Sequence, residues 1–112
     1  MNQFETLYEV IQDRRRNPRE GSYTNYLFEK GTDKILKKIG EESAEVIIAA
    51  KNAACGSGEK AELILELCDL AFHAAVLMAQ LGIEPGEISR ELALRSQKTG
   101  NLKQTHQVDK NS

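Results

Sequence analysis

A row of polar residues in an otherwise apolar stretch is the part of the sequence best suited to chemistry. At about 100° per residue of an α-helix, the polar side chains between positions 62 and 80 fall within about 60° of one another. The row contains no Lys or Arg, and like charges three or four residues apart destabilise a helix. A buried carboxylate without a partner is very costly, so a divalent cation is the simplest compensation, with a solvent-facing stripe as the alternative. The row consists of Glu62, Glu66, Asp69, His73 and Gln80.

A second acidic group precedes this stretch and contains Glu41, Glu42 and Glu45. Their spacing of three and four residues allows all three carboxylates to converge on one point of a helix. A short Gly-Ser-Gly connection makes the two helical stretches antiparallel neighbours, which can bring Glu42 and Glu45 opposite Glu66 and Asp69. Four carboxylates from two helices form an oxygen cage that suits Mg²⁺ or Mn²⁺.

Three lysines lie one to two turns before this acidic group, on the side of Glu41 and Glu45. Lys34, Lys37 and Lys38 would supply the ammonium groups that a polyphosphate chain needs beside a metal ion. The alternatives are a solvated face, or simple ion pairs between these lysines and the glutamates one turn later. Exposed pairs of that kind contribute only a few tenths of a kcal/mol.

The elements that position these groups are predicted to be helices. Helix-forming residues dominate the 112 positions, aromatic residues make up only 5%, and the length suits one domain. We expect an all-α fold, a small antiparallel bundle of four to five helices over residues 1–99, followed by a polar tail over residues 100–112. The expected helices cover about residues 2–16, 33–54, 59–81 and 84–98, with a connector over residues 22–31.

Apolar periodicity predicts which helix faces are buried. Phe4, Leu7, Tyr8 and Ile11 share one face of the first helix. The second helix is expected to bury the side opposite its carboxylates, formed by Ile35, Leu36, Ile39, Val46 and Ala50. The stretch over residues 59–81 is too apolar for four short helices to cover, so we predict a homodimer with this helix at or near the interface.

Composition excludes several other classes of protein. The formal net charge of −2 gives no indication of nucleic acid or an anionic membrane as a partner. No apolar run is long enough for a transmembrane helix, and the first residues do not resemble a signal peptide. Cys55 and Cys68 are too few for a disulfide framework. We therefore expect a cytoplasmic protein.

The acidic motifs resemble a known signature. The string E-E-x-x-E at positions 41–45, twenty residues, and then E-x-x-D at positions 66–69 is similar to the signature of the all-α nucleoside triphosphate pyrophosphohydrolases, the MazG-like proteins. Within that superfamily, residues 22–42, 45–52, 69–73 and 91–95 resemble the phosphoribosyl-ATP pyrophosphatases, which act in the second step of histidine biosynthesis. The resemblance covers about residues 2–97.

This resemblance implies hydrolysis of 1-(5-phosphoribosyl)-ATP to 1-(5-phosphoribosyl)-AMP and pyrophosphate, by cleavage between the α and β phosphates. Glu42, Glu45, Glu66 and Asp69 would hold Mg²⁺, with Mn²⁺ as a second possibility. Glu41 would orient or deprotonate the attacking water. The residues expected to bind substrate are Ser22, Tyr23, Thr24, Lys34, Lys37, Lys38, Asn52 and Arg95.

Several roles stay open at the level of the sequence. His73 is either a partner of the Asp69 carboxylate or a histidine whose hydrogen bonds are satisfied within the bundle. The three arginines at positions 14–16 either bind a phosphate or stabilise the C-terminal end of a helix by interacting with its dipole. Arg95 either binds substrate or pairs with Glu91. Two other functions remain as alternatives: a house-cleaning pyrophosphatase for ordinary or damaged dNTPs, and a non-catalytic helical adaptor that needs no Mg²⁺.

Overall fold

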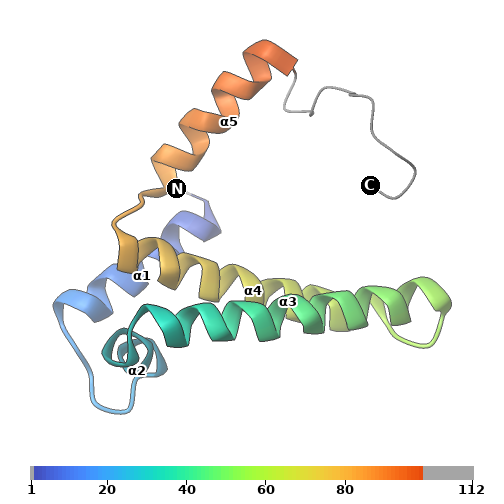
Figure 1. Ribbon diagram of the computed structural model, residues 1–112, viewed down its shortest axis with the longest axis horizontal. Coiled ribbons are helices and arrows are strands. Elements are labelled where there is room, and N and C mark those ends of the chain that lie inside the picture. The colour runs from blue at the N-terminus through green and yellow to red at the C-terminus, as the bar shows by residue number, and fades with distance from the viewer. Residues whose placement is uncertain (1, 100–112) are drawn as a thin grey trace.

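The computed structural model describes residues 2–99, and the predicted polar tail lies outside the described residues. Every regular element in this range is an α-helix, so the all-α prediction is confirmed (Figure 1). In chain order the helices are α1 (Gln3–Arg16), α2 (Tyr23–Lys30), α3 (Thr32–Cys55), α4 (Lys60–Leu81) and α5 (Pro85–Thr99). No helix among them is both long and apolar enough to cross a membrane.

The prediction of a connector over residues 22–31 is wrong, because most of this segment forms helix α2. The Ser22 hydroxyl accepts a hydrogen bond from the Asn25 backbone N–H, which caps the first turn. Gly31, at φ 90°, ends α2 and allows the chain to turn directly into α3. Eight residues are enough for a helix here because α2 packs against α1, α3 and α4.

Helices α3 and α4 form a long antiparallel hairpin, and the two run side by side in Figure 1. Gly56 ends α3 in the left-handed conformation, at φ 80°. The backbone N–H groups of Ser57 and Gly58 both donate to the Asn52 carbonyl oxygen, at 3.0 Å. A Cβ atom on Gly58 would lie 2.9 Å from the Cβ of Asn52, so the turn is closed tightly enough to require glycine.

The buried core is confined to one end of this hairpin, where α1 and α2 cover it. Tyr8 and Ile11 of α1 are buried as predicted, and both lie in the same core cluster as Ile35 of α3. The Tyr8 hydroxyl donates to the Ile83 carbonyl at 2.8 Å, and Arg15 donates to the Ala79 carbonyl, so α1 is also bonded to the end of α4. The remaining core residues are Leu27, Ala75, Val76 and Ala79.

Two apolar surfaces remain outside this core. Leu36 was expected to be buried with Ile35, but its side chain is 48% exposed because α2 covers only part of α3. Helix α5 leads away from the hairpin (Figure 1), and its residues 86–98 are all exposed. The described chain is therefore a four-helix unit with one projecting helix.

Candidate metal and nucleotide site

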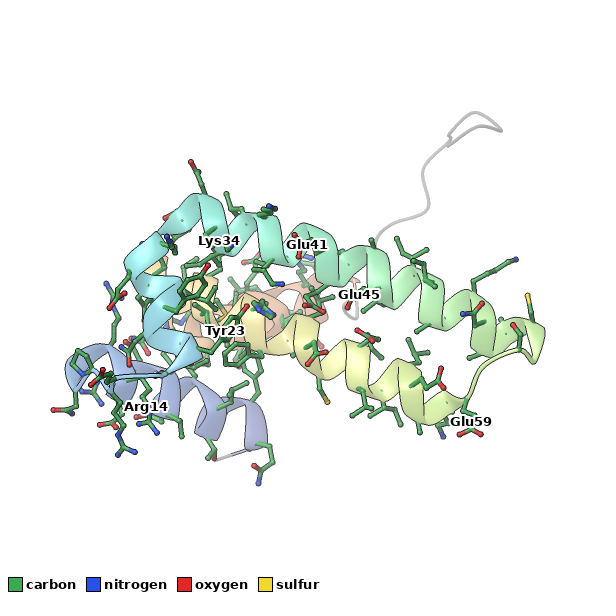
Figure 2. All side chains as sticks on the ribbon, turned by 90° about the horizontal axis from the view of Figure 1, so that it is seen from below. Arg14, Tyr23, Lys34, Glu41, Glu45 and Glu59 are labelled. Atoms are coloured by element: carbon green, nitrogen blue, oxygen red, sulfur yellow. The ribbon has the colours of Figure 1, made fainter. Side chains whose placement is uncertain are left out.

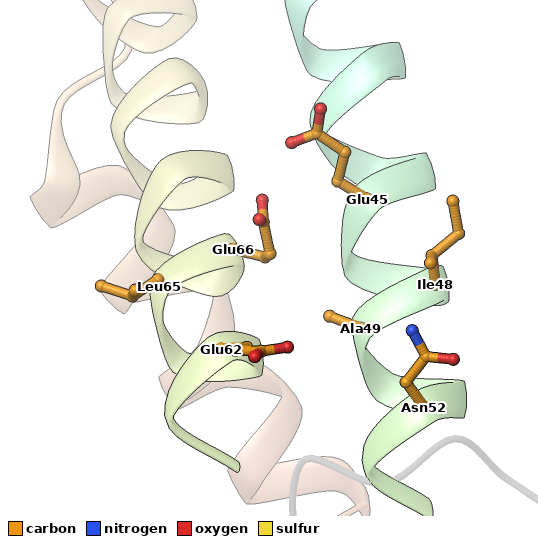
Figure 3. Close-up of a pocket in the computed structure, with 7 residues that line it drawn as sticks. All are labelled: Glu45, Ile48, Ala49, Asn52, Glu62, Leu65 and Glu66. Carbon is orange, nitrogen blue, oxygen red and sulfur yellow. The ribbon is translucent and has the colours of Figure 1, made fainter. Parts of the chain in front are cut away.

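Three carboxylates meet between α3 and α4. Glu42 and Glu45 of α3 and Glu66 of α4 each offer one oxygen, and these oxygens lie within 4.8 Å of one another. Glu45 and Glu66 point toward each other across the gap between the helices (Figure 3). The three glutamates are called the carboxylate cluster below. They converge because Glu42 and Glu45 are one turn apart on α3, while the hairpin brings Glu66 opposite them.

The carboxylate cluster contains acceptors without donors. Glu42 is only 7% exposed, and its Oε2 atom, like Oε2 of Glu66, is buried without a hydrogen-bond partner among the described residues. Burial, followed by the neighbouring Glu45, raises the pKa of Glu42. The nearby Glu45 carboxylate, followed by burial, raises the pKa of Glu66. Buried oxygens that lack donors and repel one another suit a divalent cation, because a cation supplies the missing positive charge.

Asp69, the fourth predicted ligand, stands outside this group. It lies one turn beyond Glu66 on α4, and its side chain is exposed. Its negative charge nevertheless contributes to the raised pKa values of both Glu42 and Glu66. The structure therefore brings together three of the four predicted ligands and places the fourth within electrostatic range.

Glu41 is not a member of the carboxylate cluster and forms an ion pair with a lysine. The Lys38 ammonium lies 3.1 Å from the Glu41 carboxylate, in an ion pair between residues three apart. This contact lowers the pKa of Glu41, so the carboxylate stays ionised. The simple lysine–glutamate pairing considered above therefore occurs for Glu41. It does not occur for Glu42, which is buried without an ion pair among residues 2–99.

His73 connects α4 to α2 rather than to a carboxylate side chain. Its Nδ1 atom lies 2.8 Å from the Asp69 backbone carbonyl, which can only accept, so Nδ1 carries the proton. In the neutral ring Nε2 is then an acceptor, and the Tyr23 hydroxyl, 2.9 Å away, donates to it. The ring is 5% exposed and satisfied on both sides. The interpretation of His73 as a satisfied histidine agrees with this geometry, whereas a bond to the Asp69 carboxylate does not form.

A cavity of about 300 Å³ adjoins the cluster on the side of the hairpin turn (Figure 3). Two members of the cluster, Glu45 and Glu66, form part of its wall, and Asn52 lies farther along the same face of α3. Its other walls are mainly apolar, which does not suit a phosphate chain. The complete lining is Glu45, Ile48, Ala49, Asn52, Glu62, Leu65 and Glu66.

The predicted lysines separate along α3. Lys38 forms an ion pair with Glu41, the residue that precedes Glu42 of the cluster, and Lys37 is exposed. Lys34 lies one turn earlier, with its ammonium 5.9 Å from the centre of the Tyr26 ring. The three lysines therefore do not form one compact patch.

The remaining predicted binding residues have diverse surroundings. The Ser22 hydroxyl caps α2, while Thr24 is half-buried on the same helix. Arg95 pairs with Glu91 at 3.5 Å on α5, which leads away from the cluster. Of the three arginines at positions 14–16, Arg14 pairs with the adjacent Asp13.

Sequence reasoning missed Tyr26 and Lys30 because it treated their segment as a connector. Tyr23 and Tyr26 are stacked, with ring centres 6.0 Å apart, and the Lys30 ammonium lies 5.8 Å from the Tyr26 ring centre. Residues three and four apart share a face of a helix, so these residues would have emerged as one group if α2 had been recognised.

Comparison with known proteins identifies the family. Residues 4–96 match the model of the family described as phosphoribosyl-ATP pyrophosphohydrolase. A phosphoribosyl-ATP pyrophosphatase of Clostridium novyi is 53% identical over 89% of this chain and 86% of its own length. Relatives with the same name in Streptococcus thermophilus and Pelotomaculum thermopropionicum are 47% and 58% identical, over 94% and 82% of this chain and 96% and 89% of their own lengths.

Both the fold and the cluster of acidic residues on adjacent helices are those of a helical hydrolase of phosphoanhydrides. More particularly, the chain belongs to the phosphoribosyl-ATP pyrophosphohydrolase family. The resemblance found in the sequence is thereby confirmed.

Proposed function

We propose that this protein hydrolyses the α–β phosphoanhydride of 1-(5-phosphoribosyl)-ATP, giving 1-(5-phosphoribosyl)-AMP and pyrophosphate in the second step of histidine biosynthesis. Membership of the family supports the substrate. The observation that carries the chemistry is the carboxylate cluster, with its two buried oxygens that lack partners among the described residues. An adaptor protein would have no need for such an arrangement, because it destabilises the fold.

The cluster supports a magnesium-dependent reaction. Glu42, Glu45 and Glu66 would hold Mg²⁺, and Asp69, exposed one turn away, is the proposed fourth ligand. Mn²⁺ prefers the same oxygen donors and is the natural substitute. When bound, such an ion polarises phosphate oxygens and acidifies water.

The protein's own groups would position the water and the leaving phosphates. Glu41 is ionised and lies beside the cluster, so it is the candidate to accept a hydrogen bond or a proton from water. Lys38 orients Glu41 and, with Lys37, offers positive charge for the pyrophosphate that leaves. Asn52 would contact the part of the substrate that enters the adjoining cavity. Roles for the predicted substrate ligands Ser22, Tyr23, Thr24, Lys34 and Arg95 remain proposals.

The exposed apolar residues of the hairpin support a homodimer. Ile47 and Ile48 on α3 are 69% and 60% exposed, and Leu65 on α4 is 65% exposed. These residues lie near the hairpin turn, where neither α1 nor α2 covers α3 and α4. A second copy that packs there would complete the bundle and close the adjoining cavity, which Ile48 and Leu65 help to line. The free cysteines Cys55 and Cys68 suit the reducing cytoplasm.

The test is pyrophosphate release in the presence of Mg²⁺, with phosphoribosyl-ATP, ATP and a panel of dNTPs as substrates. We expect a strong preference for phosphoribosyl-ATP, measured as kcat/KM. Glu45→Gln keeps the size of the side chain but removes one charge of the cluster. It should lower kcat by about 100-fold or more, because charges placed at a reacting phosphate commonly contribute that much.

The other outcomes separate the alternatives. Release from dNTPs alone would favour the house-cleaning pyrophosphatase and contradict the histidine pathway. Absence of release from every substrate, with or without Mg²⁺, would favour the adaptor. Lys51→Gln, an exposed change on the same helix, serves as the control and should leave the kinetics unchanged.

A further inference from the structure

A group of aromatic rings and ammonium groups lies on α2 and the start of α3. Tyr23 and Tyr26 are 44% and 39% exposed, and their rings are stacked with 6.0 Å between centres and 23° between planes. The ammonium groups of Lys30 and Lys34 lie 5.8 and 5.9 Å from the centre of the Tyr26 ring. Neither ammonium forms an ion pair with a carboxylate of residues 2–99. These four residues are called the tyrosine–lysine patch.

The tyrosine–lysine patch adjoins the carboxylate cluster but is distinct from it. Tyr23 donates a hydrogen bond to His73, which lies one turn beyond Asp69 on α4. Figure 2 shows Tyr23 beneath the part of α3 that runs from Lys34 toward Glu41 and Glu45. The patch therefore begins next to the site of the proposed hydrolysis and extends away from it, beyond Lys38.

The substrate carries phosphate at two separate places. Its triphosphate must reach the carboxylate cluster, where the α–β bond is cut. The second ribose, attached to N1 of adenine, carries a 5′-phosphate on the far side of the base. An enzyme that prefers this substrate to ATP therefore needs a second cationic site, separated from the first by a surface on which the base can lie.

We infer that Lys30 and Lys34 bind the 5′-phosphate of the N1-linked ribose, and that the adenine lies against Tyr23 and Tyr26. This inference rests on the proposed function and assigns the residues that separate phosphoribosyl-ATP from ATP. Two ammonium groups that form no ion pair among residues 2–99 attract a phosphate, and exposed aromatic rings stack on a purine.

A neighbouring cavity of about 490 Å³ is a less suitable place for this phosphate. It lies between α2 and the loop that precedes it, and both tyrosines of the patch contribute to its wall. Arg19 contributes one positive charge to its wall, but Glu20 and Glu29 contribute two negative charges. A doubly charged phosphate would be repelled there, whereas the ammonium groups of Lys30 and Lys34 attract it.

The experiment compares two ligands that differ only in the ribose 5-phosphate attached to N1 of the adenine. Affinities for 1-(5-phosphoribosyl)-AMP and AMP are measured by calorimetry with Mg²⁺ present, for the wild type, Lys30→Gln and the double variant Lys30→Gln/Lys34→Gln. We expect the double variant to bind phosphoribosyl-AMP about 10- to 100-fold more weakly, with the single variant between, because each lysine contributes a charge-assisted contact. Affinity for AMP should stay within about threefold of the wild type.

Kinetics provide a second readout. In the double variant the KM for phosphoribosyl-ATP should rise about as much as the affinity falls, while kcat changes little because these lysines do not contact the bond that is cut. Tyr26→Leu should weaken binding of both nucleotides by about tenfold, whereas Tyr26→Phe should keep the wild-type affinity. Lys51→Gln is the matched control, since it removes one exposed lysine charge from α3 near the hairpin turn.

Two results would overturn the inference while leaving the proposed function in place. One is an unchanged affinity for phosphoribosyl-AMP in the double variant, and the other is an equal loss for AMP and phosphoribosyl-AMP. If the wild-type protein releases no pyrophosphate from phosphoribosyl-ATP, the proposed function fails, and the inference fails with it.

Discussion

The two ends of the α3–α4 hairpin are built from similar apolar residues but differ in burial. At the end covered by α1 and α2, Ile35 and Val76 are fully buried. At the end near the turn, Ile47 is 69% exposed and Leu65 is 65% exposed. The difference shows that one chain buries the apolar residues of only half of the hairpin, and the exposed half is the basis of the proposed second copy.

The carboxylate cluster lies between these two ends. Glu42 is nearly buried, whereas Glu45, one turn closer to the hairpin turn, is exposed. The cluster therefore combines a buried side, which holds carboxylate oxygens without donors, with an accessible side that borders the cavity near the hairpin turn. The predictions below test this division, from the largest expected effect to the smallest.

Ile35→Ala should produce the largest loss of stability. Ile35 is fully buried, so its removal should lower the free energy of unfolding by about 2–5 kcal/mol. Leu36→Ala is the matched control, because the adjacent side chain is 48% exposed and its loss should cost well under half as much. Urea unfolding followed by circular dichroism measures both values. Equal losses would contradict the one-sided core.

Ile47→Glu should dissociate the proposed dimer. A glutamate at an apolar interface would be buried without a partner, so the dissociation constant should rise by about 100-fold or more. Sedimentation equilibrium should then report one chain of 12.5 kDa where the wild type reports two. Val10→Glu, at an exposed position of α1, is the control and should remain dimeric. A monomeric wild type would contradict the dimer.

Mg²⁺ should raise the melting temperature of the wild type. Binding to the folded state alone adds about 1.4 kcal/mol of stability when the ion is present at ten times its dissociation constant. Glu66→Gln should abolish most of this rise, because it removes a charge from the carboxylate cluster. The same rise in wild type and variant would show that Mg²⁺ binds elsewhere.

Tyr23→Phe removes a single hydrogen bond between α2 and α4. The loss of the Tyr23 hydroxyl leaves Nε2 of His73 without its donor, so stability should fall by about 1 kcal/mol. The Nδ1 and Nε2 resonances of His73 should also shift in a ¹⁵N NMR spectrum. If the resonances do not change, the hydrogen bond is absent in solution.

Without metal, stability should depend on the protonation of the carboxylate cluster. The pKa values of Glu42 and Glu66 are raised by burial and by Glu45, so the folded state binds protons more tightly than the unfolded chain. The stability that this contributes is fully present below about pH 4 and is lost as the pH rises through the raised values.

The difference between the wild type and Glu42→Gln isolates this effect. In EDTA, the wild type should lose stability relative to the variant as the pH rises from 4 to 7, because the variant cannot acquire the buried charge. Thermal melts at several pH values measure the difference, and an unchanged difference across this range would contradict the raised pKa values.

The parts of the site that could be predicted from the sequence depend on helical periodicity. Glu42, Glu45 and Glu66 converge because residues three and four apart share a helix face and because a tight turn joins the two helices. Asp69 follows the same spacing but stays outside the group, since its side-chain conformation depends on neighbours that spacing does not describe. Likewise, Leu36 was expected on the core face but is 48% exposed, because it lies about 100° around the helix from the buried Ile35.

Helix α2 could not be recognised by periodicity because it is only eight residues long. Ser22 and Gly31, which begin and end this helix, flank the segment in the sequence. The eight residues between them are too few to show a clear helical period, so the sequence predicts a connector there. Its stability comes from packing, with Leu27 fully buried against the other helices, and from the hydrogen bond between Tyr23 and His73. Such contacts join residues fifty positions apart, which local patterns do not reveal.

Helix α3 also sets a limit on how this chain can change in length. Lys34, Glu45 and Asn52 lie on one continuous helix, so their order and phase are set by a rise of about 1.5 Å and a rotation of about 100° per residue. One inserted residue between Lys38 and Glu45 would rotate the lysines about a quarter turn away from the carboxylates. Insertions and deletions should therefore be tolerated in the loop around Arg19, but not within this stretch.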